Sequence, residues 1–205
     1  YTTKILGTYE ITTTPSDLKD VATVSAGGTA YTYTAKSQLI DAKDLKVWDK
    51  VHNVDLVYRE DFLTGDMPTA LKAGTVWVDI RAMGTEYTGE TKVSINIAPK
   101  NIADENVEQI SENNYTESVN YIGSEVEYQV PATLKSGCLS FNGEILSTND
   151  YSVRLRKGDV VSANYKDAGE YEIIAVAKGN YTGVRVLGTL TVNPIQLKDS
   201  DFSLA

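Results

Sequence analysis

The sequence predicts an all-β protein made of two similar β-sandwich domains in tandem. A repeat with a constant offset of 95 residues runs through the chain. Apolar and polar residues alternate with a period of two in runs rich in β-branched and aromatic side chains, which is the pattern of half-buried strands. Glycine, asparagine and aspartate separate these runs at short intervals, as in sandwiches. The 205 residues leave room for two domains of about 100 residues each.

The internal repeat is the most informative feature of the sequence. It is clearest in two boxes, Gly-Thr-Glu-Tyr-Thr-Gly at 84–89 and Gly-Asn-Tyr-Thr-Gly at 179–183. Further residues match at the same offset of 95: Gly28 and Gly123, Tyr33 and Tyr128, Leu39 and Leu134, Asp55 and Asp150, Gly74 and Gly169, and Pro99 and Pro194. The Tyr-Thr-Gly box departs from this offset by one residue, which one inserted residue in the first copy explains. We therefore divide the chain into domains at 1–99 and 100–205.

A linker-like segment that begins with proline occurs three times, at 15–20, 99–104 and 194–199. Residues 1–14 resemble the closing strand of a preceding repeat, and 195–205 resemble the opening of a following one. The pattern predicts a fragment of a longer array. Proline ends a strand ladder and stiffens the junction, because it fixes the backbone and lacks a donor.

The strands follow one another in the same order in both copies. We expect them at 29–35, 44–48, 54–59, 76–82 and 95–97, and again at 125–130, 138–141, 150–155, 171–178 and 190–192. In 76–82, Val78 and Ile80 are expected to face the core and Trp77 the solvent. The stretch 105–122 is extra, and we expect a short helix or an edge strand there. No segment has a sustained helical period.

Composition excludes several classes of protein. The chain has 28 acidic and 19 basic residues, for a net charge of −9, which disfavours binding to nucleic acid or to anionic lipid. No apolar run approaches the roughly 18 residues of a membrane helix, so direct membrane insertion is not expected. No signal peptide is present, although the chain opens on Tyr1 and targeting information could have been removed. Cys138 is the single cysteine and is expected to be small and buried.

The order of the motifs in the second copy resembles a known family. Asn142-Gly143, Asp150-Tyr151, Ala168-Gly169 and the 179–183 box occur as in the tandem immunoglobulin-like repeats of large bacterial surface proteins. The resemblance covers 28–99 and 123–194. The first copy departs from it, with Leu56 after Asp55 and an additional Glu86.

The resemblance implies two tandem immunoglobulin-like β-sandwich domains in an extracellular location, on the cell surface or attached to the cell wall. It implies a non-enzymatic structural spacer or adhesion module. Its partners would be the flanking repeats of the same chain and a host or community glycan or surface protein. The alternative is a carbohydrate-binding or protein-docking module within a larger surface protein or secreted enzyme.

Catalytic motifs are missing from the sequence. His52 is the only histidine and lies in a polar, loop-like stretch, where a solvated side chain is expected rather than a general base. No nucleophile elbow, phosphate loop or zinc-ligand spacing occurs. We therefore expect no enzymatic activity and no cofactor, with calcium as the one candidate.

Calcium is suggested by acidic residues in each linker copy. These are Asp17 and Asp20, Asp104 and Glu105, and Asp199 and Asp201. Calcium requires several oxygen ligands together, so we prefer a solvated, charged linker. An intramolecular Lys–Asn crosslink is a further possibility, with Lys19, Lys36, Lys100, Asn96 and Asn193 as candidates.

Ligand binding is the main alternative to a spacer. The chain has 13 tyrosines and two tryptophans, and exposed aromatic rings can stack on sugars. Trp77 is the candidate binding residue, although its counterpart Glu172 shows that it is not part of the repeat. Tyr87 and Tyr181 are expected to close strand corners, with the hydroxyl bonded to the backbone. Ile174 and Val176 are expected to face outward, where they would form a docking patch unless another segment covers them.

Overall fold

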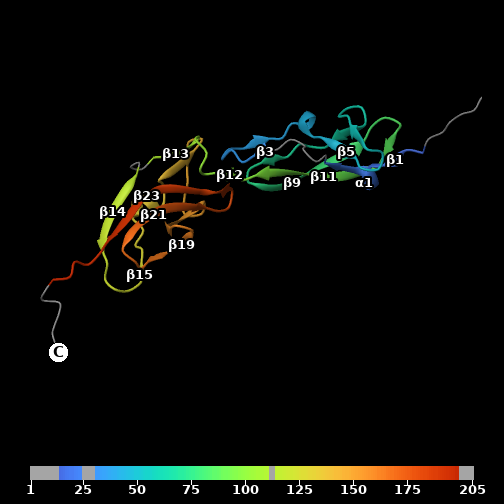
Figure 1. Cartoon of the computed structure of the whole chain (residues 1–205). Coiled ribbons are helices and arrows are strands. Elements are labelled where there is room, and N and C mark those ends of the chain that lie inside the picture. Colours follow the sequence, from blue (N-terminus) through green and yellow to red (C-terminus); the bar gives the residue numbers. More distant parts are fainter. Residues whose placement is uncertain (1–13, 25–30, 111–113, 199–205) are drawn as a thin grey trace, which may run out of the picture. The chain divides into compact units, whose positions relative to one another are not determined.

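The computed structural model describes residues 14–24, 31–110 and 114–198, and the chain is almost all β (Figure 1). The contacts divide it into two compact units. The first comprises the described residues of 1–31, 39–70 and 75–96, and the second those of 32–38, 71–74 and 97–205. Below, the first repeat means the described residues before Pro99, and the second repeat means those from Pro99 onward.

The first repeat is built on a four-stranded sheet in the order β3-β11-β9-β7. The strands are β3 (Tyr31–Thr32), β11 (Glu90–Ala98), β9 (Gly74–Ala82) and β7 (Phe62–Thr64). A three-stranded sheet has the order β2 (Ala22–Val24), β5 (Val47–Asp49) and β6 (Val54–Leu56). Two-stranded sheets join β1 (Ser16–Asp17) to β10 (Tyr87–Thr88) and β4 (Gln38–Leu39) to β8 (Thr69–Ala70). Short helices are α1 (Leu18–Val21) and the 3₁₀ helix η1 (Ala42–Asp44).

The second repeat also has one large sheet, one three-stranded sheet and two two-stranded sheets, but its large sheet has five strands. Its five-stranded sheet has the order β14 (Tyr115–Asn120), β23 (Val184–Asn193), β21 (Gly169–Ala177), β18 (Tyr151–Lys157) and β19 (Val160–Ser162). Its three-stranded sheet has the order β13 (Val107–Gln109), β16 (Leu139–Phe141) and β17 (Glu144–Ile145). Two-stranded sheets join β12 (Lys100–Asn101) to β22 (Tyr181–Thr182) and β15 (Val126–Glu127) to β20 (Asn164–Tyr165), and α2 spans Ala132–Lys135.

These sheets confirm the predicted all-β class. The central strands β9 and β21 lie at the predicted offset of 95 residues, and both last strands, β11 and β23, end directly before a proline. The extra stretch 105–122 contains β13 and β14, so the edge-strand alternative is confirmed. β14 pairs in parallel with β23, with Tyr115 opposite Gly188. The predicted strand at 29–35 is described only from Tyr31 and contains the two-residue β3.

Apolar side chains are buried in both repeats. In β9, Val78 and Ile80 are each 1% exposed. Trp77, the residue before Val78, is 60% exposed, as the alternation predicts. Phe62 on the neighbouring β7 is fully buried. The second repeat has a continuous core in which Tyr151 is 1% exposed. Burial of this kind stabilises a domain by about 25 cal/mol per Å² of apolar surface removed from water.

A linker segment opens each repeat by pairing with the Tyr-Thr-Gly box of that repeat. Ser16 lies opposite Tyr87 in the parallel pair β1–β10, and Lys100 lies opposite Tyr181 in the parallel pair β12–β22. We call each pairing an opening clasp. It follows that both linkers, which the sequence presents as connectors, are hydrogen-bonded parts of the domains that they precede.

The glycine of the box is required by the opening clasp. Gly89 and Gly183 have φ angles of +80° and +86°, which side-chain-bearing residues rarely adopt. A Cβ atom on either glycine would also collide with the side chain of Asp17 or Asn101 in the paired linker. The repeated glycine therefore serves both the turn and the approach of the linker.

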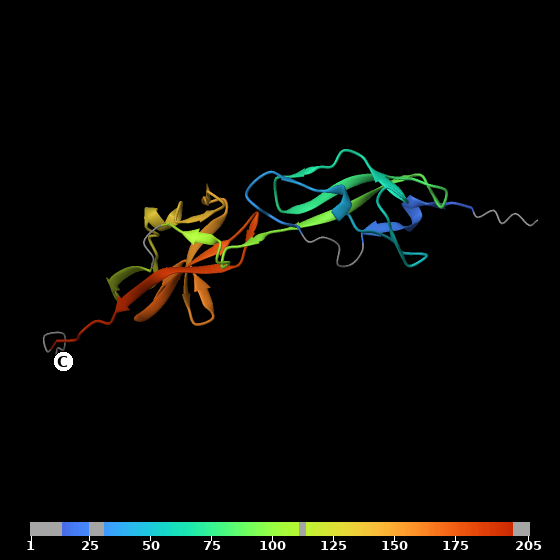
Figure 2. The ribbon, with the colours of Figure 1, turned by 90° about the horizontal axis from the view of Figure 1, so that it is seen from above.

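The third copy of the linker behaves differently. Leu18 and Ile102 directly follow β1 and β12, and both are fully buried. Leu197 is the corresponding residue of the third copy, and it is 69% exposed, while Ile195 is 53% exposed. In Figure 2 the red segment after β23 runs away from the sheets of the second repeat. Leu197 thus exposes an apolar side chain at the position where the two other copies bury one.

Candidate functional site

Trp77 lies on a part of β9 that extends beyond its neighbour β7. The paired register of β7 and β9 runs from Thr64 opposite Ile80 to Phe62 opposite Ala82. The indole therefore stands beyond the end of the short strand, on the exposed face of the sheet. The predicted outward orientation of Trp77 is confirmed by its exposure of 60%.

The second repeat has no such platform. There β18 pairs with β21 along its whole length, from Tyr151 opposite Ala177 to Arg156 opposite Glu172. Glu172 is the counterpart of Trp77, and its carboxylate accepts a 2.6 Å hydrogen bond from the Arg156 guanidinium. The exposed tryptophan and the shortened neighbouring strand are thus features of the first repeat.

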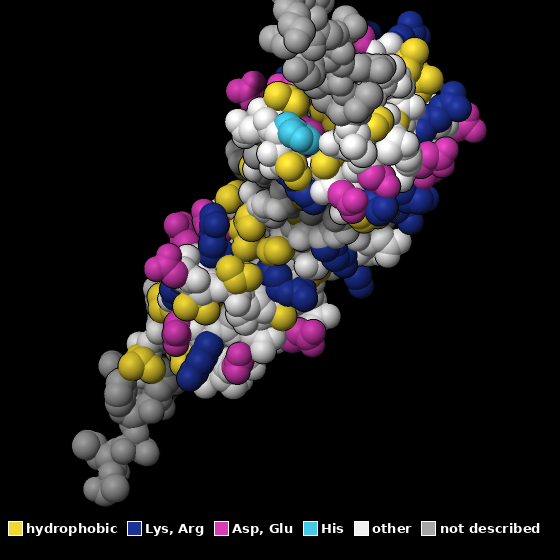
Figure 3. All heavy atoms as spheres, turned by 90° about the vertical axis from the view of Figure 1, so that its right-hand side faces the viewer, with side chains coloured by type: hydrophobic (Ala, Val, Ile, Leu, Met, Phe, Trp, Pro, Cys, Tyr) yellow, Lys and Arg dark blue, Asp and Glu magenta, His cyan; other side chains and the backbone are white. Residues whose placement is uncertain are grey.

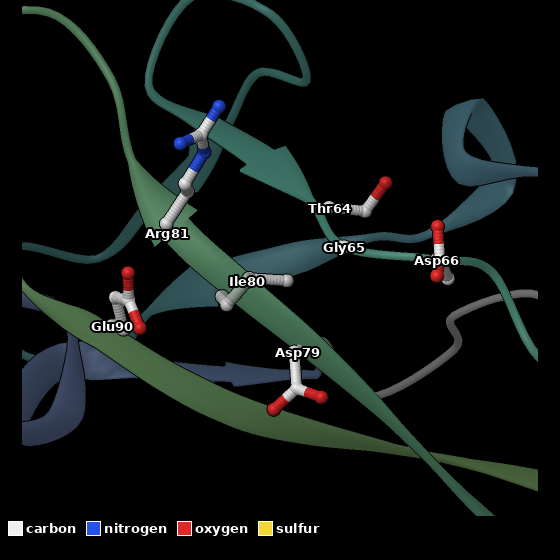
Figure 4. Close-up of a pocket in the computed structure, with 7 residues that line it drawn as sticks. All are labelled: Thr64, Gly65, Asp66, Asp79, Ile80, Arg81 and Glu90. Carbon is white, nitrogen blue, oxygen red and sulfur yellow. The ribbon is translucent and has the colours of Figure 1, made fainter.

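A shallow hollow lies along β9 at Asp79, Ile80 and Arg81, which begin two residues after Trp77 in the strand (Figure 4). It is lined by the polar or charged residues Thr64, Asp66, Asp79, Arg81 and Glu90 and by Gly65 and Ile80. Gly65 follows β7 and donates a 2.9 Å backbone hydrogen bond to the carbonyl of Asp79. Because glycine has no side chain, the sheet is left open at this point. The Asp79 carboxylate forms a 3.2 Å ion pair with Lys92 of β11, and both side chains are more than 60% exposed.

The charges on this surface are mixed. Figure 3 shows acidic and basic side chains interspersed on the face that it displays. Among the hollow and its rim, Asp66, Asp79 and Glu90 are acidic and Arg81 and Lys92 are basic. Such a surface offers hydrogen-bond donors and acceptors without a strong field of one sign.

The described linker carboxylates pair with lysines or face the solvent. Asp17 caps α1, accepting from the backbone N–H of Lys19, and forms a 2.7 Å ion pair with the ammonium of Lys19. The Lys19 ammonium lowers the pKa of Asp17. Asp20 is exposed, Asp104 binds the Lys100 ammonium at 2.5 Å, and Glu105 is exposed. In the parts of the chain that the structure describes, no three His, Cys, Asp or Glu residues gather into a possible metal site. Asp199 and Asp201 lie outside the described residues.

The candidate crosslink residues do not form the buried triad that the reaction needs. Lys19, Lys36 and Asn96 are exposed, whereas Lys100 is 8% exposed and bonds to Asp104. The amide of Asn193 donates to the Ser118 hydroxyl at 2.7 Å. The structure therefore gives the crosslink no support.

Ile174 and Val176 do not form an exposed docking patch on β21, so of the two alternatives that the sequence left open, an exposed patch or a covered one, the exposed patch is not found. Ile174 is fully buried and Val176 is half-buried, although strict alternation places both on the outward face. The pairing of β21 with β23 shifts register between Ile173 and Ile174. The extra residue of this bulge is Leu187 on β23, so β21 keeps its alternation, with Tyr171, Ile173 and Ala175 in the core cluster. Ile174 lies outside that cluster and is nevertheless fully buried, which favours the alternative that another segment covers it.

His52 contacts a buried carboxylate that the sequence analysis missed. Asp49 is fully buried, and its carboxylate accepts hydrogen bonds from the backbone N–H groups of Val51 and His52 at 2.8 and 2.9 Å. The His52 Nδ1 lies 2.6 Å and the Tyr87 hydroxyl 3.1 Å from the other carboxylate oxygen. An ionised carboxylate only accepts hydrogen bonds, so Nδ1 carries the proton.

The environment of Asp49 controls two pKa values. Burial raises the pKa of Asp49, but the bonds from His52, Val51 and Tyr87 outweigh burial and hold it below the ordinary value. Burial and the adjacent carboxylate raise the pKa of Tyr87 to about 12. Tyr87 thus bonds to a side chain and not to the backbone, contrary to expectation. The cluster holds the turn after β5 against the Tyr-Thr-Gly box.

Two other tyrosines make the backbone contacts that were expected of the box. The Tyr151 hydroxyl donates to the carbonyl of Leu134 at 3.0 Å, and the Tyr171 hydroxyl donates to the carbonyl of Asp167 at 2.9 Å. Cys138 is fully buried, as predicted, and its Sγ lies 3.0 Å from the Tyr151 hydroxyl. Tyr181 is 5% exposed and packs against Phe141 in the core.

Comparison with known proteins gives no relative: no family model matches the chain, and no curated protein and no solved structure is significantly similar to it. None of the helices in the described parts is long and apolar enough to cross a membrane.

Proposed function

We propose that this chain is a non-enzymatic structural spacer or adhesion module of a bacterial cell-surface protein, built from two tandem immunoglobulin-like β-sandwich domains. The observation that carries the proposal is the repeated opening clasp. In both repeats the linker pairs in parallel with the Tyr-Thr-Gly box, and the residue after it, Leu18 or Ile102, is fully buried.

The short connection between the repeats supports a mechanical role. β11 ends at Ala98 and β12 begins at Lys100, so Pro99 is the only residue between two hydrogen-bonded strands. Proline fixes φ near −65°, which leaves this connection little conformational freedom. A linker with few rotatable backbone bonds transmits a pulling force from one domain to the next.

The entry of the second repeat is also anchored to its last strand. The Arg185 guanidinium on β23 donates to the carbonyls of Ile102 and Val107. β14 and β23 form a parallel pair over six residues, from Tyr115–Gly188 to Asn120–Asn193. A force that pulls the two strands in opposite directions along their lengths acts on all of these hydrogen bonds at once. Such a pair resists unfolding under tension, as a spacer must.

The exposed third linker supports membership of a longer array. Leu197 exposes more than half of its surface, whereas the matching Leu18 and Ile102 are buried in the repeats that they open. We propose that residues 194–198 open a further repeat in the same way.

Single-molecule pulling of the 205-residue chain tests the spacer proposal. We expect two unfolding events, each releasing about 300 Å of chain, because each repeat of 95 residues extends to roughly 3.3–3.6 Å per residue. Surface labelling of intact source cells should mark the protein without lysis. A single event, or labelling only after lysis, would contradict the proposal.

A further inference from the structure

We infer that the exposed face of β9 in the first repeat is a binding site for an uncharged polysaccharide, with Trp77 as the stacking platform. The inference goes beyond the spacer role and does not depend on it. It rests on the exposed indole, the end of β7 beside it and the polar hollow that follows along the same face.

The indole fits the apolar face of a sugar ring. A pyranose presents C–H groups on its faces and hydroxyls around its rim. A tryptophan that is 60% exposed on a sheet stands ready to stack without rearrangement, and burying its ring removes apolar surface from water. Pre-organisation matters because each side chain immobilised on binding costs about 0.5–1.5 kcal/mol.

The polar groups beside Trp77 fit the rim of the sugar. Asp79 lies two residues along β9, so its side chain is on the same face as Trp77. Its partner Lys92 holds the carboxylate at 3.2 Å, and Arg81 and Glu90 continue the polar surface around the hollow. Carboxylates and guanidinium groups can each make two hydrogen bonds to neighbouring hydroxyls.

The composition of the face disfavours other occupants. A protein partner would require a larger continuous apolar area than one indole beside a hollow with four charged lining residues. Three acidic and two basic groups lie at the hollow and its rim, so no strong positive field attracts a polyanion. An uncharged chain of sugars needs neither feature.

The second repeat provides an internal control. Glu172 replaces the tryptophan there and is paired with Arg156. The strand β18 also continues alongside β21 to Arg156, where the first repeat has its hollow. Binding should therefore involve the first repeat alone.

The test uses the whole chain on an array of soluble neutral polysaccharides, namely β-glucans, xylans, mannans and galactans, with anionic polysaccharides as a separate arm. Polysaccharides that bind on the array are titrated into the chain by calorimetry, and we expect one binding site per chain. Trp77→Ala and Trp77→Glu should each weaken binding at least tenfold, and Trp77→Phe should retain part of it. Asp79→Ala should weaken binding severalfold.

The control is Val160→Ala, which removes an exposed apolar side chain from the second repeat and should leave binding unchanged. Thermal unfolding must be the same for all variants, as expected for exposed positions. The Trp48→Phe variant leaves Trp77 as the only tryptophan. The fluorescence of Trp77 in this variant should change when the polysaccharide is added. The inference is overturned if no neutral polysaccharide binds, if only anionic ones bind, or if Trp77→Ala binds as well as the unchanged chain.

Discussion

Asp49 shows how one buried charge can organise a loop. Its side chain has no exposed surface, yet four donors surround it, from Val51, His52 and Tyr87. A buried carboxylate is tolerated only where hydrogen bonds replace the lost water. The single histidine of the chain therefore has a structural partner that explains its position.

Removing this carboxylate should destabilise the first repeat. Asp49→Ala leaves the Tyr87 hydroxyl and two backbone N–H groups without an acceptor, and each unsatisfied buried group costs about 1–3 kcal/mol. We expect a loss of about 2–4 kcal/mol in the free energy of unfolding, measured by urea denaturation. Asp159→Ala, at an exposed position, should change it by less than about 0.5 kcal/mol. Equal effects of the two substitutions would refute the role of Asp49.

The same residue predicts a dependence on pH. The pKa of Asp49 is lower in the folded chain than its ordinary value of 3.8, so the unfolded chain takes up the proton first. Its contribution to stability is complete above that value and is lost as the pH falls through the folded pKa. The difference in unfolding free energy between the unchanged chain and Asp49→Ala should shrink as the pH falls below about 4. A difference that stays the same or grows below about pH 4 would contradict this assignment.

At the scale of elements, the opening clasps turn a linker into part of a domain. The sequence could predict the repeated Tyr-Thr-Gly box and the repeated linker, because both are short and lie at regular spacing. It could not predict that the two pair, since the contact joins residues about 70–80 positions apart. The same limit applies to Arg185, whose carbonyl partners lie roughly 80 residues away and have no sequence signature.

Alternation predicted the core-facing residues of β9 and β21, but not the burial of Ile174. Both strands read as half-buried, and Trp77 lies outward as expected. On β21, Tyr171, Ile173 and Ala175 lie in the core as expected, whereas Ile174 is fully buried outside that core cluster, and a hydrophobic pattern does not show what covers the second face of a strand. The candidate glycan site was thus predictable at Trp77 but not at its hollow, which depends on where β7 ends.

The three linker copies allow a matched experiment. Leu18→Ala and Ile102→Ala should each cost about 2–4 kcal/mol, because they empty a fully buried position. Leu197→Ala makes the same change at an exposed position of the third copy and should cost less than about 0.5 kcal/mol. The measurement is urea denaturation of the three variants. Comparable losses at Leu18 and Leu197 would argue against the opening clasp.

A glycine provides a second prediction at this scale. A Cβ atom at Gly188 would collide with the backbone carbonyl of Tyr115, so Gly188→Ala should push β14 away from β23. We expect faster amide hydrogen exchange across 115–120 and a loss of about 1–3 kcal/mol. Thr191→Ala on the same strand is the control. Unchanged exchange in β14 would show that the strand tolerates the side chain.

At the scale of the molecule, two units with separate cores should unfold separately. Leu18→Ala should lower the melting temperature of one calorimetric transition, and Ile102→Ala that of the other. By size scaling, a loss of 2–4 kcal/mol in a domain of about 100 residues lowers the melting temperature by roughly 10–25 °C. A single transition that both variants shift equally would show that the repeats unfold as one.

The opening clasps also bear on how such a chain could have grown. Both halves of a clasp lie between one linker proline and the next, so a duplication bounded by these prolines copies a segment that already contains its own first and last strands. An added copy would need no compensating change in its neighbour to complete its sheets. Lengthening by whole repeats is therefore an accessible route of evolution for this sequence, whereas a breakpoint between Asn101 and Tyr181 would separate the partners.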